Sequence, residues 1–306
     1  MHAIASIRPA HQADVHRRRA PASLRHIDAA ISARMAGDPP AASALVAQVV
    51  EDAASAFGGK VWLTDLMALL APFGVGERLM RTCVFRLVHQ GTLCSVRYGR
   101  RSAYGPAAAR SDSIPVPCAE PPDEHTQWTM VMGWSGRLSG AEQDALRKQL
   151  WQDGFRLVAP GVFARPGSAP ASLRAGLERL GLGRRLWVCR MGELPGTGQR
   201  PLSELVDAAW DLAPAIADYR AFIERYAAVL DSVRAAPAMA SREAFMLRTL
   251  LLYDWRRAQR HDPHLPPALL PPDWPGERCA ALCRELDALT ADSASRHLAQ
   301  SRAAES

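Results

Sequence analysis

The sequence predicts an α+β protein with three domains: an N-terminal winged helix-turn-helix, a ferredoxin-like middle domain and an all-helical C-terminal domain. An arginine-rich amphipathic helix precedes a segment that alternates like a hairpin. Strand-like and helix-like segments then follow in the order β-α-β-β-α-β, and the remainder has helical periodicity. The expected divisions are a disordered basic tail (1–41), the winged helix (42–105), a linker (106–127), the ferredoxin-like domain (128–196), a helical domain for effector binding and dimerisation (197–299) and a tail (300–306).

The composition favours an anionic partner. The chain has 306 residues and a formal net charge of +6, which favours nucleic acid, an anionic membrane or an acidic ligand. No run of about 18 apolar residues occurs, and the N-terminus lacks the apolar core of a secretory signal. The six cysteines are scattered and form no disulfide framework. We therefore expect a protein of the reducing cytoplasm that does not associate with membranes.

The first 40 residues are rich in Ala, Arg, His and Pro and show little periodicity, so we expect this segment to be disordered. Its basic composition has two interpretations. One is a solvated tail, and the other is a tail that adds non-specific attraction to DNA. Met35 lies just before the first periodic segment and is a candidate for the true start of the chain.

The predicted winged helix contains three helices, a short strand and a hairpin. Apolar residues recur at i+4 from Leu45 to Phe57, which predicts the first helix. VWL predicts a strand, DLMALLAPFG a second helix, and ERLMRTCVFRLVHQ a third helix that Gly91 ends. The segment TLCSVRYGRRSAYG alternates around Gly99, as a two-stranded wing does. In chain order these elements are expected at 42–57, 61–63, 65–74, 76–90 and 92–105.

The third helix has two faces on a helical wheel. Phe85 lies in the polar arc, where we expect it to pack under the hairpin; the alternative is contact with a thymine methyl group. The apolar arc consists of Leu79, Met80, Cys83, Val84, Leu87 and Val88. The opposite arc consists of Arg78, Arg81, Thr82, Arg86 and His89.

Cations on this helix and again on the hairpin predict contact with DNA. A helix in the major groove and a hairpin over the backbone or minor groove would use both groups, and a guanidinium can bind guanine or phosphate through two hydrogen bonds. A solvated charged face is the alternative, which the near absence of acidic residues to pair with the arginines makes weaker. The expected DNA-binding residues are Arg78, Arg81, Thr82, Arg86, Arg97, Tyr98, Arg100 and Arg101.

The rest of the chain contains the predicted linker, middle domain and helical domain. The linker is rich in proline. In the middle domain, Ser139 and Glu142 have the spacing of a capping box at the start of a helix. The proline-rich segment HDPHLPPALLPPDWPG interrupts the helical pattern of the last domain. Helices are expected there near 201–210, 212–235, 240–260 and 276–298.

No motif predicts an enzyme or a metal site. The sequence GWSG at 133–136 is one residue short of the nucleophile motif G-x-S-x-G, and no glycine-rich phosphate loop occurs. His261, His264, Cys279 and Cys283 match no standard zinc spacing, and we expect loop histidines and core cysteines. We therefore expect no catalytic residue, no metal and no cofactor.

The stretch ERLMRTCVFRLVHQGTLCSVRYGRRSAYG resembles the winged-helix segment of the PaaX family, repressors of phenylacetic acid degradation operons in bacteria. LRKQLWQDGFRLVAPGVFARP resembles the family's middle domain, and WDLAPAIADYRAFIERY and DPHLPPALLPPDWPGERCAALC its C-terminal domain. The resemblance covers about 43–299. Thr92 replaces the aromatic residue that the family usually has there, which affects only the packing between helix and wing.

The resemblance implies a GntR-like repressor that binds a palindromic operator of a phenylacetate catabolic operon as a homodimer. It also implies that phenylacetyl-CoA, an aryl-CoA effector, releases the protein from double-stranded DNA. Base contacts are expected near the N-terminus of the third helix. The residues expected to contact bases are Arg78, Arg81 and Thr82, and those expected to contact phosphates are Arg86, Arg100 and Arg101. The candidate effector-binding residues are Trp210, Tyr219, Arg220, Tyr253, Arg256 and Arg257.

The middle domain also resembles the small ferredoxin-like fold of CRISPR-associated Cas2 proteins, some of which are nucleases. That activity needs a carboxylate at the end of the first strand to hold a metal, where this chain has Gly133-Trp134-Ser135. A dimerisation or spacer module is the expected role. Two alternatives to the repressor remain: a nucleic-acid-binding protein without a small-molecule switch, and an enzyme that handles acyl-CoA.

Overall fold

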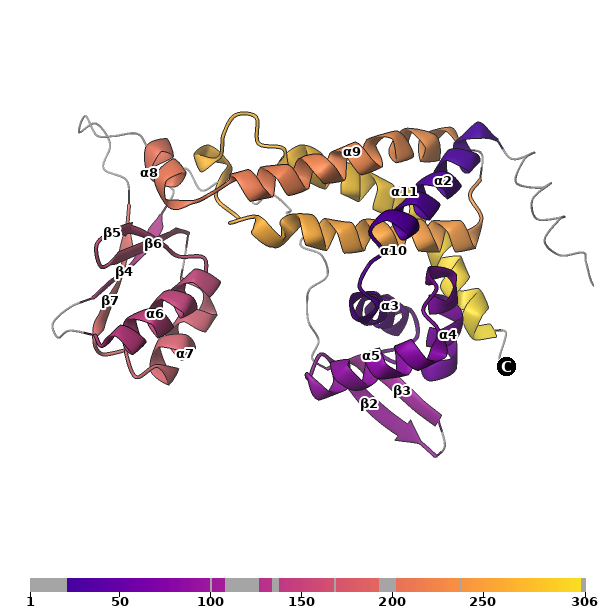
Figure 1. The fold of residues 1–306 in the computed structure, drawn as a ribbon, viewed down its shortest axis with the longest axis horizontal. Coiled ribbons are helices and arrows are strands. Elements are labelled where there is room, and N and C mark those ends of the chain that lie inside the picture. Colours follow the sequence, from indigo (N-terminus) through magenta and orange to yellow (C-terminus); the bar gives the residue numbers. More distant parts are fainter. Residues whose placement is uncertain are drawn as a thin grey trace, which may run out of the picture. The chain divides into compact units, whose positions relative to one another are not determined.

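The computed structural model describes residues 21–99, 101–107, 127–133, 138–167, 169–192, 202–236 and 238–303. The chain divides into two compact units (Figure 1). Unit 1 combines residues 1–116, 219–258 and 277–306, and unit 2 combines residues 117–218 and 259–276. The predicted mixed α+β architecture is confirmed: N-terminal helices with a small antiparallel sheet, a second sheet in the middle and a helical C-terminal part.

The N-terminal part of unit 1 contains the helices, strand and hairpin that the sequence predicts. Its three strands are antiparallel and lie in the order β1-β3-β2. Helix α3 contacts α4, α5 and β3, and seven of its residues are buried, all of them apolar except Gln48. The elements are α2 (Ala22–Gly37), α3 (Ala42–Ala56), β1 (Val61–Trp62), α4 (Leu63–Leu70), the 3-10 turn η1 (Ala71–Phe73), α5 (Glu77–His89), β2 (Leu93–Tyr98) and β3 (Arg101–Pro106).

Helix α2 corrects the expectation of a disordered tail over residues 1–41, because residues 22–37 are helical. Ile27 and Ile31 are buried one turn apart, and Arg34 continues this row as a buried charged residue. The helix packs against α10. The sequence pattern missed it because two apolar residues and an arginine form its inner face. Residues 1–20 lie outside the described residues.

Three long helices form the rest of the helical part, as predicted: α9 (Ala213–Ala235), α10 (Ser241–Ala258) and α11 (Gly276–Ala303). In unit 1 an aromatic cluster joins α9 to α10, since Tyr219 and Phe222 contact Trp255 with ring centroids 6.1 and 5.8 Å apart. Helix α10 lies against both α2 and α3. The C-terminal helices therefore support the N-terminal elements directly.

Unit 2 has an antiparallel sheet of four strands in the order β5-β6-β4-β7. Helices α6 and α7 cover one face around Phe155 and Leu150, and α8 with the segment around Leu265 and Leu269 covers the other. The predicted capping box is present, since Ser139 N donates to Glu142 Oε2 at 2.7 Å. The elements are β4 (Trp128–Gly133), α6 (Gly140–Gln152), β5 (Arg156–Ala159), β6 (Val162–Pro166), α7 (Ala171–Arg179), β7 (Leu186–Met191), α8 (Leu202–Ala209), η2 (Gln259–His261) and η3 (Pro267–Leu269).

The two units do not coincide with the expected domains. The expected helical domain, 197–299, is divided, because its first residues and the proline-rich segment pack in unit 2 while α10 belongs to unit 1. Long-range packing of Trp210, Leu265 and Leu269 against Trp128 causes this division. Among the described residues, no helix combines the length and apolar character needed to cross a membrane.

Candidate nucleic-acid interface

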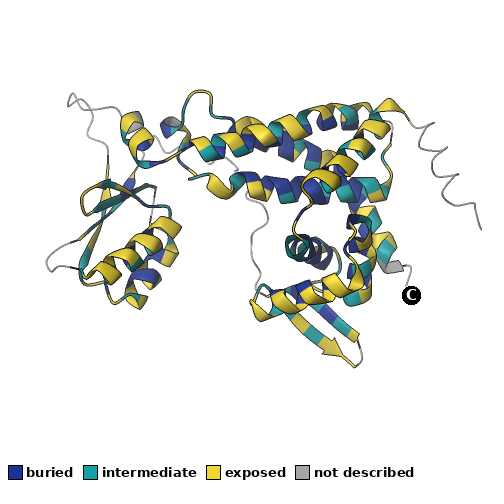
Figure 2. Ribbon diagram, viewed as in Figure 1, coloured by how far each residue is buried: buried dark blue, intermediate teal, exposed yellow. Residues whose placement is uncertain are grey.

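Helix α5 presents a cationic face to solvent (Figure 2). It follows Gly76 in an extended conformation and ends before Gly91, which has a φ of +71°. Met80, Cys83, Val84 and Leu87 are buried, which fixes the rotation of the helix about its axis. Leu79, assigned to the apolar arc, is 48% exposed at its edge. The outward residues are Arg78, Arg81, Thr82, Phe85, Arg86 and His89.

One arginine of this face has an acidic partner. Arg81 Nη2 lies 2.7 Å from Glu77 Oε1, and both side chains are more than half exposed. Exposed pairs of this kind contribute little to stability and exchange readily. No carboxylate among the described residues pairs with Arg78 or Arg86. Thr82 Oγ1 donates to the Arg78 carbonyl at 2.9 Å, and its methyl group remains on the exposed face.

Phe85 does not pack under the hairpin, so the expected packing is wrong. Its side chain is 72% exposed and stacks on His89 one turn later, with ring centroids 6.5 Å apart. The inner face of α5 is already filled by Met80, Cys83, Val84 and Leu87, and Phe85 points away from it. The other expectation, an aromatic ring available to a thymine methyl group, is the one that this geometry allows.

The β2–β3 hairpin carries cations on both faces. Tyr98 pairs with Arg101 across the strands, and Arg97 pairs with Ser102, so the two arginines lie on opposite faces. Both are exposed, and Arg97 Nε donates to the Gly99 carbonyl at 3.1 Å. Gly99, with a φ of +59°, starts the turn. Arg100 lies outside the described residues.

Helix α5 and the hairpin contact each other and lie at the same end of unit 1 (Figure 1). Thr92 joins them, because its N–H donates to the Leu87 carbonyl at 2.9 Å and its own carbonyl accepts from Ala107 N at 3.1 Å. Backbone groups of Thr92 make this connection, so it does not need an aromatic side chain there. The described arginines of the two groups therefore lie on neighbouring elements, and their contact with DNA stays a prediction.

Lys60 and Trp62 add to this surface, and the sequence analysis missed both. The Trp62 ring packs edge-on against Tyr98 with centroids 5.4 Å apart, and Lys60 Nζ lies 3.4 Å from the Tyr98 hydroxyl. They reach the hairpin because β1 pairs with β3. Gly105 permits this pairing, since a Cβ there would lie 2.4 Å from the Gly59 carbonyl oxygen. The only sequence signal was a lysine directly before a two-residue strand.

The candidate effector residues do not converge on one cavity. Trp210 and Tyr219 are buried in the cores of unit 2 and unit 1 respectively. Arg256 pairs with Glu51 at 2.8 Å and Arg257 with Asp38 at 2.5 Å, so both arginines join α10 to the N-terminal elements. Tyr253 accepts a hydrogen bond from Ala41 N at 3.4 Å. Arg220 is exposed.

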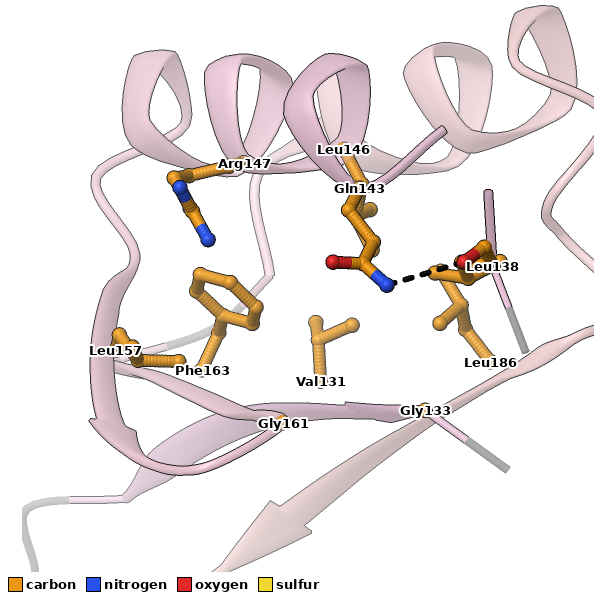
Figure 3. Close-up of a pocket in the computed structure, with 10 residues that line it drawn as sticks. All are labelled: Val131, Gly133, Leu138, Gln143, Leu146, Arg147, Leu157, Gly161, Phe163 and Leu186. Carbon is orange, nitrogen blue, oxygen red and sulfur yellow. Dashed lines mark hydrogen bonds between the residues drawn. The ribbon is translucent and has the colours of Figure 1, made fainter. Parts of the chain in front are cut away.

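Unit 2 contains a cavity of about 300 Å³ between α6 and the sheet (Figure 3). Val131, Phe163 and Leu186 line it, and the polar side chains in its wall are Gln143 and Arg147, which come from α6. Gln143 Nε2 donates to the Leu138 carbonyl at 3.0 Å. None of the six candidate effector residues lines this cavity.

Comparison with known proteins connects this interface to a family. The profile described as PaaX-like protein matches residues 41–108, and the profile described as PaaX-like protein C-terminal domain matches residues 210–300. The protein named transcriptional repressor PaaX, from Escherichia coli (strain K12), is 31% identical over 252 residues, which cover 80% of this chain and 79% of that protein. The chain belongs to the PaaX family. The first matched segment contains α5, the hairpin and Lys60.

A solved structure, the uncharacterized protein Rv0674 from Mycobacterium tuberculosis, aligns with a TM-score of 0.46 and 22% sequence identity. The alignment covers 75% of this chain and 88% of that one. The relative from E. coli is named a transcriptional repressor. Across the described residues, no group of three or more His, Cys, Asp or Glu could hold a metal ion. Cys279 and Cys283 are core residues as predicted, and burial raises the pKa of Cys283 to about 12.

Proposed function

We propose that the chain is a DNA-binding repressor in which α4 and α5 form a helix-turn-helix and β2 and β3 form its wing. The exposed face of α5 carries this proposal: Arg78 and Arg86 have no carboxylate partner in the described structure, and they neighbour the cationic hairpin. A helix of this size fits the major groove, and the adjacent hairpin can contact the backbone.

The proposed contacts follow position along α5. Arg78, Arg81 and Thr82 lie nearest the helix N-terminus and would contact bases, whereas Arg86 on the helix and Arg101 on the wing would contact phosphates. Arg97, Tyr98 and Arg100 complete the wing contacts. Phe85 adds an apolar contact for a thymine methyl group. Arg81 must leave Glu77 to reach a base, so Glu77 competes with DNA for this guanidinium.

The proposed operator is that of an aromatic catabolic operon, and phenylacetyl-CoA is the proposed signal that releases the protein. The proposed form is a homodimer. Unit 2, with its ferredoxin-like strand order, is suited to hold it together, because β7 is an edge strand with Trp187, Val188 and Met191 exposed. Exposed apolar edge strands pair readily with a second chain. Binding of the effector to one conformation of the dimer would lower its affinity for the operator.

A gel shift with an operator selected from randomised duplex DNA tests this function. The parent protein is expected to bind the selected duplex and to release it when phenylacetyl-CoA is added, and not when free phenylacetate is added. Arg78→Ala is expected to weaken binding, and Arg174→Ala, which removes an exposed arginine of α7 in unit 2, is the matched control. No selected sequence, or equal binding by the parent and Arg78→Ala, would contradict DNA recognition. Binding that ignores phenylacetyl-CoA would indicate a nucleic-acid-binding protein without this switch.

A further inference from the structure

A second cavity of unit 2, of about 590 Å³, lies where α6 leads into β5. Its volume is within the range of small-molecule sites. The turn after α6 forms one wall, and the start of α9 together with η2 and the residues after it forms another. The residues that matter for its chemistry are Trp151, Asp153, Arg156, Arg165, Asp211, Arg260, His261 and His264.

The cavity wall contains a flat cationic surface. The guanidinium carbon of Arg156 lies 3.6 Å from the centroid of the Trp151 ring, and Trp151 is nevertheless 61% exposed. Arg156 Nη1 donates to the Phe155 carbonyl at 2.9 Å, which holds the stack in place. No carboxylate among the described residues pairs with Arg156. Indole rings and guanidinium planes at a surface are the groups on which nucleobases stack.

Further cations lie around the same cavity. Arg260 is exposed, and no carboxylate of the described residues pairs with it. His261 Nδ1 lies 2.7 Å from Asp218 Oδ2, which fixes the imidazole and leaves Nε2 for another partner. Arg165 lies over Gly154, with its guanidinium carbon 4.0 Å from the position of a Cβ. Arginine and histidine in a shared cavity are suited to phosphate oxygens.

The acidic residues of the cavity bind groups of the protein. Asp153 accepts from Gln149 Nε2 at 2.9 Å and from Ser172 Oγ at 2.6 Å. Asp211 Oδ1 accepts from Ala213 N at 3.1 Å, at the start of α9. Asp262, the third acidic residue of the lining, accepts from His264 N at 2.7 Å. These contacts hold the walls in position, and Asp211 Oδ2 is left to accept from an amino group such as that of a base. The cavity thus offers a stacking surface, cations and an acceptor.

We infer that this cavity binds a nucleoside phosphate, with the base stacked on Trp151 and Arg156 and the phosphate held by Arg260 and His261. A CoA thioester, the class of the proposed effector, carries a nucleotide at one end. The identification of the natural ligand as this effector rests on the proposed function. The cavity would bind that nucleotide end, while the rest of the effector lies elsewhere. Binding of the nucleotide end does not require an acyl group.

Calorimetric titration of the full-length protein with ADP, CoA, adenosine and pyrophosphate tests the inference. ADP and CoA are expected to bind, and adenosine and pyrophosphate are each expected to bind about tenfold or more weakly, since each lacks one half of the ligand. Trp151→Ala is expected to weaken ADP binding about five- to hundredfold, and Trp151→Phe to retain most of it. Arg260→Ala is expected to weaken it about tenfold.

Matched controls lie on the same unit. Arg174→Ala and Arg184→Ala each remove an exposed arginine of unit 2 that does not line the cavity. Both are expected to bind ADP like the parent. The inference is overturned if the parent does not bind ADP, if pyrophosphate binds as tightly as ADP, or if the Trp151→Ala and Arg260→Ala variants bind like the controls.

The operator gel shift separates this inference from the proposed function. If the same concentration of phenylacetyl-CoA releases the parent protein and the Trp151→Ala and Arg260→Ala variants from DNA, this cavity does not bind the effector. The proposed repressor function is unaffected by that result. If ADP and CoA bind with the expected pattern but phenylacetyl-CoA leaves the DNA complex intact, the cavity stands and the proposed effector response fails.

Discussion

Arg34 joins two segments that lie 220 residues apart in the chain. Its guanidinium makes two hydrogen bonds to Asp254 at 2.7 and 2.9 Å, and the side chains are 4% and 3% exposed. Asp254 also accepts from Arg225 and from the hydroxyl of Tyr226. Nη1 of Arg34 is buried without a partner in the described structure. This buried network therefore connects α2 to α9 and α10.

Removing Arg34 should destabilise unit 1 strongly. Arg34→Met keeps an apolar stem and leaves Asp254 short of one cation, and breaking a buried pair in this way costs about 3–5 kcal/mol. Arg234→Ala is the matched control: it breaks the exposed pair with Glu285 and should cost less than about 1 kcal/mol. Urea unfolding followed by circular dichroism measures both. Equal losses of unfolding free energy in the two variants would show that the buried pair contributes no more to stability than the exposed pair.

Asp52 on α3 should make stability depend on pH. Burial raises its pKa to about 6, against the opposing effect of Arg248 and Arg256 and with smaller contributions from Glu51 and Asp287. The folded protein therefore binds this proton more tightly than the unfolded chain, and the contribution of Asp52 to the free energy of unfolding falls as pH rises from about 4 to 6. Above pH 6 the full cost of burying the ionised Asp52 side chain lowers the free energy of unfolding.

Asp52→Asn removes this dependence. The free energy of unfolding of the variant, relative to the parent, should rise by about 1–3 kcal/mol between pH 4 and pH 7. Urea midpoints at several pH values across this window measure the difference. Two curves that stay parallel from pH 4 to pH 7 would mean that Asp52 ionises in the folded protein as it does in the unfolded chain.

At the scale of elements, the proposed contacts of α5 predict distinct effects for two arginines that lie five residues apart. Arg81→Ala should weaken operator binding by about 1–3 kcal/mol and relax sequence preference at one position, as the loss of a base contact does. Arg86→Ala should weaken binding to all sequences alike and lower the slope of log affinity against log salt by about one. Titrations of operator and random duplex at several salt concentrations distinguish these two patterns. A loss of sequence preference in the Arg86 variant would reverse the assignment.

Glu77→Gln tests the competition for Arg81. Because the exposed pair is worth about 0.2–1 kcal/mol, release of the guanidinium should raise operator affinity about two- to fivefold. Glu178→Gln frees Arg174 on α7 in the same way and should leave DNA binding unchanged. The same titrations give the result, and weaker binding by the Glu77 variant would show that the pair positions Arg81 for DNA.

Elements with local signals could be predicted from the sequence, and elements that depend on distant partners could not. The first and third helices of the N-terminal part follow apolar periodicity, and glycine residues such as Gly91 and Gly99 mark their connections. Helix α2 depends on Asp254, which no local pattern reveals. For the candidate site, local patterns predicted a helix and a hairpin that carry arginines, and the role of these arginines in DNA binding stays a prediction. Lys60 and Trp62 were missed because β1 reaches the hairpin only through strand pairing.

At the scale of the whole molecule, α5, the hairpin and most of the C-terminal helices share unit 1. Gln48 of α3 is buried and donates to the Thr249 carbonyl of α10 at 3.3 Å, while Glu51 pairs with Arg256. The proline-rich segment that interrupts these helices packs instead with the sheet of unit 2. No reading of local pattern could place these long-range contacts, which is why the expected domain boundaries differ from the units.

A fragment of residues 21–116 should therefore be incomplete on its own, because α3 would expose groups that α10 buries. We expect it to lack a cooperative thermal transition, and we expect addition of a fragment of residues 219–306 to restore one. Circular dichroism of each fragment and of their mixture measures this. Cooperative unfolding of the first fragment alone, unchanged by the second, would show that the N-terminal elements need no support.

The contact between α2 and α10 also bears on synthesis in the cell. Because translation proceeds from the N-terminus, α2, α5 and the hairpin leave the ribosome before α10 does. The buried partner of Arg34 therefore arrives late. A product that ends before α10 would carry the arginines of α5 without Asp254, the residue that holds Arg34 and α2 in place.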